Sequence, residues 1–343
     1  MNSPISRRSA LAGLVAAPAV LGLSRRALAA PKTLKISHQF PGGTTESGDF
    51  RDRLCRRFAA DVGKRTGGEL NFEIYPNSSL MKTFAQFSAL RKAALDFSLY
   101  PTSYAGGEVP ELNLTFMPAI VTTYAQGFAW KKSEIGREMT SLLESKGVKI
   151  VAWVWQSGGI ASRAAPVVRP QDAKGLKIRG GSREMDAMFN AAGASSQTMP
   201  SNEIYIAMQT GNVDAAVTSS TSLISFKLEE VSKHLTSAGG RSFFFVFEPL
   251  LMSKQIFDGL PKPHQDAIVA AGEAQEQFGL DAAKADDKEM DQVYAKAGAQ
   301  VHAMDDKALA EWRDVAASSA WKDYAERSPG CARFLKMAEA VTA

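Results

Sequence analysis

The sequence predicts an α/β fold made of two lobes, with a long helix linking them. Strand-like and helix-like segments alternate from residue 34 to residue 252, which favours sheets covered by helices on both faces. Once an N-terminal leader is set aside, roughly 310 residues remain, a length typical of two domains. From about residue 262 onward the pattern is helical. A long helix here would tie the two lobes together.

The first half of the chain supplies the clearest periodicities. Leu70, Phe72 and Ile74 alternate with polar residues, as in a half-buried strand. Residues 148–156 are apolar on both faces, which predicts a central strand of a covered sheet. The expected strands are 34–40, 69–76, 96–101 and 148–156, and the expected helices are 50–62, 83–95 and 134–147.

The second half continues the alternation and then becomes helical. The expected strands are 175–179, 196–200, 213–219 and 241–252, and the expected helices are 183–194, 202–211, 222–235, 261–298, 308–327 and a last short one. This order assigns residues 31–155 and 243–285 to lobe I, and residues 156–242 and 286–343 to lobe II. We expect the chain to cross between the lobes near Gln156 and Arg241.

The N-terminus has the anatomy of an export signal. Arg7 and Arg8 precede an apolar stretch from residue 11 to residue 23, which ends in Ala27-Leu28-Ala29. Thirteen apolar residues are too few to span a bilayer, which needs about twenty. The paired arginines favour a twin-arginine signal over residues 1–29, and a Sec signal is the alternative. We expect cleavage after Ala29 and a periplasmic product.

The charge balance of the remaining chain argues against nucleic acid as a partner. Residues 1–30 hold four of the 40 basic residues and no acidic residue, which leaves 36 basic against 36 acidic residues. A neutral chain without a basic cluster lacks the electrostatic footprint that binds phosphate backbones.

No pattern of catalytic or metal-ligating residues is visible. The four histidines are scattered, and no Gly-x-Ser-x-Gly elbow occurs. The sequence has two cysteines, Cys55 and Cys331, which could form a disulfide or remain two separate buried thiols. We therefore predict neither an enzyme, nor a metal, nor a cofactor.

Arg179 is the residue that most directly suggests a function. It ends the strand 175–179 and is followed by two glycines and a helix. In α/β sheets, ligands lie beyond the carboxyl ends of the strands. With no carboxylate close in sequence, Arg179 is either a solvated surface charge or the group that holds an anion.

The segments QDAKGLKIRGGSREMDAMFNAAGA (171–194) and MPSNEIYIAMQTGNVDAAV (199–217) are the most distinctive of the chain, and the segments 57–80, 90–104 and 109–124 accompany them. Together they resemble one family, the extracytoplasmic solute receptors of TRAP (tripartite ATP-independent periplasmic) transporters, in which the last three segments belong to the N-terminal lobe. The resemblance implies a two-lobed periplasmic binding protein, type II-like, that closes on an organic acid. It also implies delivery of that acid to a TRAP permease, and we expect the receptor to be a monomer.

The resemblance places the ligand carboxylate on Arg179, whose planar fork suits such a group. Thr218 stands where many relatives have a ligand-contacting asparagine. In a sugar-acid-binding branch of the family, polar residues that contact the ligand stand at the positions of Lys82, Pro101 and Tyr104. Tyr100, Tyr104, Trp155 and Phe243 would form an aromatic wall, with core packing as the alternative for each ring. The full set of candidate ligand-binding residues is Arg179, Thr218, Ser201, Tyr104, Tyr100, Trp155, Gln156, Lys82 and Phe243.

These replacements favour an apolar or aromatic monocarboxylate over a sugar acid or a dicarboxylate. If the ammonium of Lys82 reaches the cleft, it would instead favour a ligand with a second carboxylate or a sulfonate. One branch of the family binds its ligand through a cation, but the segment 213–220 offers no acid beyond Asp214, so we predict no metal. A receptor for another transporter or a sensor, and an exported hydrolase, are the alternative functions.

Overall fold

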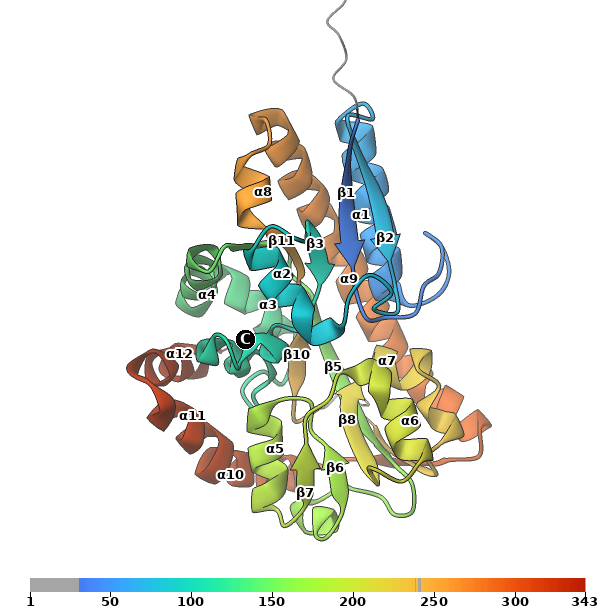
Figure 1. Ribbon diagram of the computed structural model, residues 1–343. Coiled ribbons are helices and arrows are strands. Elements are labelled where there is room, and N and C mark those ends of the chain that lie inside the picture. The colour runs from blue at the N-terminus through green and yellow to red at the C-terminus, as the bar shows by residue number, and fades with distance from the viewer. Residues whose placement is uncertain (1–30, 238, 240–241, 343) are drawn as a thin grey trace, which may run out of the picture. The chain divides into compact units, whose positions relative to one another are not determined.

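The computed structural model describes residues 31–237, 239 and 242–342. The signal predicted over residues 1–29 and the crossing predicted at Arg241 lie outside the described residues. Within them, strands and helices alternate as expected and build two separate sheets (Figure 1).

The first sheet has five strands in the order β2-β1-β3-β11-β4. β1, β2 and β3 are parallel to one another, and β11 runs antiparallel to both β3 and β4. Helices α1, α2, α4 and α8 pack on this sheet, and α3 packs on α4 and on β5 of the second sheet. The bounds are β1 Lys32–Ser37, β2 Leu70–Tyr75, β3 Phe97–Leu99, β4 Val148–Ala152, β11 Leu250–Ser253, α1 Phe50–Arg65, α2 Gln86–Arg91, α3 Tyr124–Lys132, α4 Glu134–Ser145 and α8 Lys254–Asp258.

The second sheet has seven strands, six of them in the order β12-β9-β5-β8-β6-β7, with β10 pairing to β5. The parallel pairs β6–β7 and β6–β8 come from the βα units that the sequence predicts. The bounds are β5 Trp155–Ser162, β6 Lys177–Arg179, β7 Ser195–Gln197, β8 Ala215–Ser219, β9 His234–Ser237, β10 Phe245–Phe247, β12 Gln300–Ala303, α5 Arg183–Ala191, α6 Ile204–Gln209 and α7 Ser220–Ser225.

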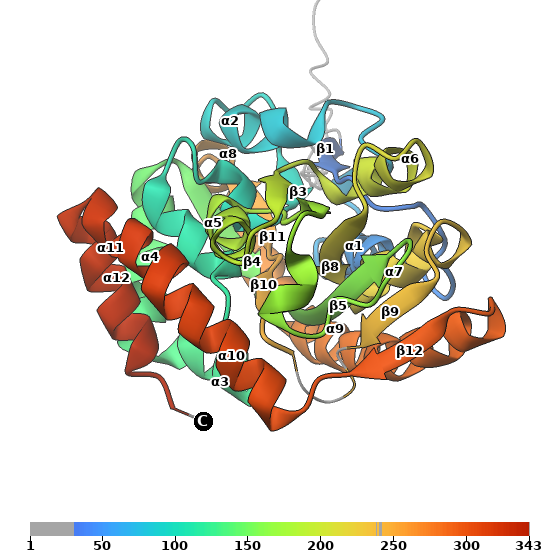
Figure 2. The ribbon, with the colours of Figure 1, turned by 90° about the horizontal axis from the view of Figure 1, so that it is seen from below.

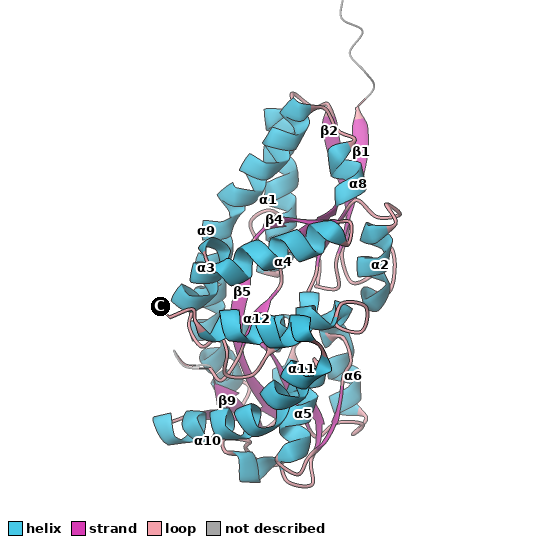
Figure 3. Cartoon of the chain, turned by 90° about the vertical axis from the view of Figure 1, so that its left-hand side faces the viewer, coloured by secondary structure: helices cyan, strands magenta, loops and turns pink. Residues whose placement is uncertain are grey.

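The predicted long helix is confirmed as α9, Lys262–Lys296, which packs against elements of both sheets (Figures 1 and 3). It contacts α1 and β4 on one side, and α7, β5, β9 and β12 on the other. Asp286 and Asp287 of α9 accept hydrogen bonds from Thr221 and Tyr124, at 2.6 and 2.7 Å. The helix is therefore the linker between the two sheets that the sequence predicts.

The last helices also reach elements associated with both sheets. α10 (Asp306–Ala316), a π-turn (Ala317–Trp321) and α11 (Lys322–Arg327) follow one another, and α12 (Pro329–Glu339) ends the series. The first of these pack on α5, whereas α12 packs on α4 and on the 3₁₀ segment Pro110–Phe116 (Figure 2). This C-terminal segment is a second connection besides α9.

The single strand predicted over 241–252 is wrong, because the structure divides it between the two sheets. β10 pairs with β5 in the second sheet, and β11 pairs with β3 and β4 in the first. Pro249, which has no N–H, lies at the break. The strand predicted over 148–156 breaks in the same way, into β4 and β5, at Trp153 and Val154.

The helix predicted over 222–235 is also too long. α7 ends at Ser225, and Lys227 adopts a left-handed conformation with φ of 56°. A 3₁₀ turn (Leu228–Glu230) follows, and residues 234–237 form β9. The apolar residues after Lys227 have helical spacing but do not lie in one helix, since Leu228 belongs to the 3₁₀ turn and Leu235 to a strand that pairs with β5 and β12.

Gly272 allows α9 to lie directly against β4. A Cβ at this position would stand 2.1 Å from the carbonyl oxygen of Val151, which belongs to the sheet backbone. We expect Gly272→Ala to lower the free energy of unfolding by about 1–3 kcal/mol through overpacking. Gly63→Ala in α1 is the matched control, since its Cβ would meet nothing nearer than 3.6 Å. That change should raise stability by about 0.5–1 kcal/mol, as measured by urea unfolding. Equal effects of the two changes would contradict the packing assigned to Gly272.

Glu184 of α5 gives the fold a pH-dependent contribution. Its buried carboxylate meets Arg327 of α11 at 2.7 Å, yet burial outweighs this attraction and raises its pKa from 4.5 to about 7. A raised carboxyl pKa stabilises the folded state below pH 4.5, and this stabilisation is lost as the pH rises through 7. The shift corresponds to at most about 3 kcal/mol. The stability difference between the native protein and Glu184→Gln should therefore change between pH 5 and pH 8 in urea unfolding. A difference that is equal at both values would refute the raised pKa.

Candidate functional site

A small cavity lies where strands of both sheets end. Its walls come from the segment after β3, from the ends of β6 and β8, and from β10 with the residues that follow it. Every lining residue except Tyr104 is buried. The cavity is lined by Pro101, Tyr104, Phe116, Arg179, Ser201, Thr218, Ser219, Val246 and Glu248.

Arg179 is buried at the end of β6, with 1% of its surface exposed. Its Nε and Nη2 donate to the carbonyl oxygen of Met199 at 3.0 and 2.8 Å, and its Nη1 donates to that of Val217 at 2.5 Å. Nη2 also donates to the hydroxyl of Tyr104 at 2.9 Å. Among the described residues, no carboxylate forms an ion pair with this guanidinium. The charge of Asp186 acts on Arg179 only at longer range, where burial raises the pKa of that carboxyl and Arg179 works to lower it. A buried positive charge without a directly paired carboxylate is costly, which favours an anion as its partner.

The two glycines after Arg179 have a steric role. Gly181 has a φ of +90°, and a Cβ there would lie 2.4 Å from Nη1 of Arg179. The chain can therefore turn directly beside the guanidinium before α5 begins at Arg183.

Three further candidates gather around Arg179. The hydroxyl of Tyr104 accepts hydrogen bonds from Arg179 and from the backbone N–H of Ser201, the latter at 3.2 Å. The side-chain hydroxyl of Ser201 is buried and has no partner among the described residues. Thr218, on β8, lines the same cavity. Polar groups from separate elements thus converge here.

Tyr100 and Gln156 lie near these residues but are not among those that line the cavity. The ring of Tyr100 meets that of Tyr104 edge-on, with centroids 5.9 Å apart, and stacks on Phe87. Burial raises the pKa of the Tyr100 phenol well above its ordinary value. Gln156 is buried in β5 and donates a hydrogen bond to Glu248. Both residues therefore support residues of the cavity wall.

Trp155, Phe243 and Lys82 lie elsewhere. Trp155 packs edge-on against Trp130, at 5.1 Å between centroids. Phe243 stacks on Trp312 at 5.4 Å. Both rings are buried in a hydrophobic core, and the side chain of Lys82 is exposed. The cavity therefore has only two aromatic lining residues, Tyr104 and Phe116.

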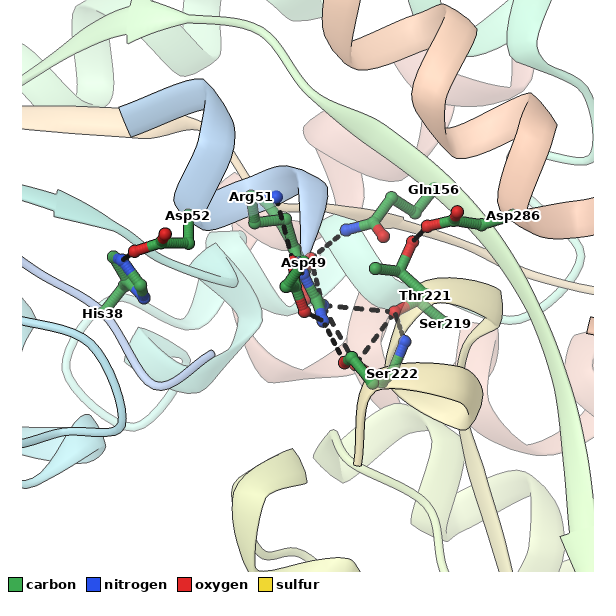
Figure 4. A network of polar contacts seen from close by, with 11 residues as sticks. His38, Asp49, Arg51, Asp52, Gln156, Ser219, Thr221, Ser222 and Asp286 are labelled. Carbon is green, nitrogen blue, oxygen red and sulfur yellow. Dashed lines mark hydrogen bonds and ion pairs between the residues drawn. The ribbon is translucent and has the colours of Figure 1, made fainter. Parts of the chain in front are cut away.

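Sequence reasoning missed the acidic group of this site, Glu248, and the network behind it (Figure 4). Nη1 of Arg51, in α1, lies 3.2 Å from Oε2 of Glu248, and it also donates to Ser219 and Ser222, at 3.3 and 2.9 Å. Asp49 pairs with Arg51 at 2.7 Å. The sequence contained one signal for this residue. Glu248 interrupts a long apolar run, where a charged residue is unusual and suggests a specific role.

The described residues contain no cluster of three or more His, Cys, Asp or Glu side chains arranged to hold a metal. Cys55 and Cys331 are both buried and do not pair with each other, which decides between the alternatives that the sequence leaves open. None of the helices in the described part of the chain combines the length and the apolar character needed to cross a membrane.

Several known proteins are similar to this chain over most of its length. A solute-binding protein of Albidiferax ferrireducens is 56% identical over 313 residues, which cover 91% of this chain and 93% of that protein. The C4-dicarboxylate-binding periplasmic protein DctP of Rhodobacter capsulatus is 30% identical and covers 90% of this chain and 91% of that protein.

A crystal structure of a TRAP periplasmic solute-binding protein from Rhodoferax ferrireducens, with bound malonate, has a TM-score of 0.89 and 57% identity. It matches 90% of this chain and 98% of that one. Residues 43–327 match the family model described as bacterial extracellular solute-binding protein, family 7. The chain therefore belongs to family 7 of the bacterial extracellular solute-binding proteins, the family of the TRAP periplasmic solute receptors.

Proposed function

We propose that this protein captures a small organic acid in the periplasm and delivers it to the membrane subunits of a TRAP permease. The observation that carries the proposal is the buried guanidinium of Arg179, which meets no carboxylate among the described residues and lines a small cavity. The proposal includes export by the signal over residues 1–29, with cleavage after Ala29, and a monomeric receptor without catalytic activity.

The hydrogen bonds of Arg179 suggest how it would hold the ligand. A guanidinium has five N–H groups, and four are directed at Met199, Val217 and Tyr104. One N–H on Nη1 remains. The hydroxyl of Tyr104 accepts from Arg179 and from Ser201, so its own proton is free to be donated. A carboxylate would accept from this N–H and from Tyr104, and both bonds are strengthened by charge.

The walls of the cavity favour a ligand with one carboxylate and a largely apolar body. Pro101, Phe116 and Val246 contribute apolar surface, and Arg179 is the single cation among the nine lining residues. Glu248 would repel a second carboxylate. We therefore propose an apolar or aromatic monocarboxylate.

A short dicarboxylate is the second candidate, favoured by the malonate bound to the relative from Rhodoferax ferrireducens. Burial raises the pKa of Glu248 despite the attraction of Arg51. If Glu248 is protonated, its O–H could donate to the second carboxylate instead of repelling it.

Replacement of Arg179 tests the anion site. We expect Arg179→Ala to weaken binding of any ligand by about 2–5 kcal/mol, which is roughly thirtyfold to several thousandfold. Arg179→Lys should recover only part of the loss, because an ammonium lacks the planar fork. Titration calorimetry measures both effects, and circular dichroism checks that the variants fold. An affinity that Arg179→Ala leaves unchanged would remove the centre of this proposal.

A thermal-shift screen of organic acids tests the ligand class. A bound acid at a hundredfold excess over its Kd should stabilise the folded protein by about 2.7 kcal/mol. We expect the largest shifts with small monocarboxylates. The screen should include malonate, aromatic acids and sugar acids at equal concentration. A response confined to malonate and other dicarboxylates would favour the second candidate, and tight binding of a hexuronic acid would contradict both.

A further inference from the structure

Glu248 is the one acidic residue that lines the cavity, and its position is fixed by the backbone. It lies between β10 and β11, where its N–H donates to the carbonyl oxygen of Val154 at 2.9 Å. Only 4% of its surface is exposed. This hydrogen bond fixes the backbone of Glu248, and contacts with Gln156 and Arg51 hold its carboxyl in the wall.

The two oxygens of this carboxyl differ in their surroundings. Oε2 accepts from Nε2 of Gln156 and from Nη1 of Arg51, the latter at 3.2 Å. In the described part of the chain, no hydrogen bond reaches Oε1. One oxygen is thus anchored, and the other can still accept.

The guanidinium of Arg51, behind the cavity wall, holds the carboxyl of Glu248 in this orientation. Arg51 is fully buried, donates to both oxygens of Asp49 at 2.9 and 2.7 Å, and lies 3.6 Å from the centre of the Phe40 ring. A single guanidinium therefore serves two carboxyl groups, Asp49 and Glu248. The cavity has a cation, Arg179, and an acceptor-rich group, Glu248, in its lining.

We propose that Glu248 is a specificity-determining residue, whose Oε1 accepts a hydrogen bond from a hydroxyl group on the ligand. This inference rests on the proposed function, since it assumes that Arg179 holds the ligand carboxylate. The ligand class then narrows to a small hydroxy acid with one carboxylate and an otherwise apolar body. The partnerless hydroxyl of Ser201, in the same wall, supplies a second polar contact for such a ligand.

The proposal is tested by the ratio of two affinities, which a purely structural role of Glu248 would not alter. Titration calorimetry on the mature protein at pH 8 compares propionate, 3-hydroxypropionate, lactate and malonate. At least one of the two hydroxy acids should bind about tenfold or more tightly than propionate, since a hydrogen bond to a charged acceptor is worth that much.

Two variants at position 248 test whether the preference comes from the hydrogen-bond acceptor of Glu248 or from the size of its side chain. Glu248→Gln keeps the size and a neutral acceptor, so the advantage of the hydroxy acid should fall to severalfold. Glu248→Met has no oxygen, so the advantage should disappear. If the second variant fails to fold, the first still decides, because the ratio is measured on folded protein.

Glu276→Gln is the matched control. Glu276, in α9, pairs with Lys131 at 2.8 Å and accepts from the N–H of Trp153 at 2.9 Å, yet it is not among the residues that line the cavity. This variant should keep the full preference for the hydroxy acid. A loss as large as that in Glu248→Gln would overturn the inference.

The remaining outcomes are also decisive. Equal affinity of hydroxy acid and propionate in the native protein, or a preference that both Glu248 variants retain, overturns the role of Glu248 and leaves the receptor function intact. Tightest binding of malonate does the same and supports the dicarboxylate candidate. If no tested acid binds and Arg179→Ala changes nothing in a wider screen, the proposed function itself fails.

Discussion

The hydrogen bond between the N–H of Glu248 and the carbonyl of Val154 joins two chain segments at the point where both pass from one sheet to the other. β4 and β11 lie in the five-stranded sheet, whereas β5 and β10 lie in the seven-stranded one. Because the two segments run antiparallel and are bonded at the crossing, the ends of both sheets are held facing a common space. The cavity, Arg179 and the network of Arg51 all depend on this double crossing.

Charge placement follows from the same geometry. The crossing brings Glu248 and Gln156 to the wall, and α1 brings Arg51 and Asp49 behind it. Burial works against the charge of Arg51, but the two carboxyls together raise its pKa. Arg51 is thus paired directly with two carboxyl groups, whereas Arg179 forms no ion pair among the described residues. This difference is the reason for proposing a structural role for Arg51 and a binding role for Arg179, although both are buried.

The sequence could predict the features that are written in local patterns. The βα alternation, α9 and the position of Arg179 at a strand end all follow from periodicity, strand-end chemistry and a family motif. The division of residues 241–252 did not follow, because an apolar run carries no mark of which sheet each half joins. The orientation of Trp155 and Phe243 was equally hidden, since a ring that packs in a core and one that faces a ligand have the same sequence pattern. Glu248 and Arg51, separated by 197 residues, meet only through tertiary structure.

In the proposed function, the buried guanidinium of Arg179 would link stability to binding. Hydrogen bonds to Met199 and Val217 compensate Arg179 for lost hydration, but carbonyl dipoles do not neutralise its charge. In the proposed function, an anion that enters the cavity would supply the direct counter-charge that Arg179 lacks. Since the lining residues come from both sheets, such an anion would favour the arrangement in which the sheets face each other across it. The affinity would then depend on this arrangement, so that moving the two sheets apart would release the ligand.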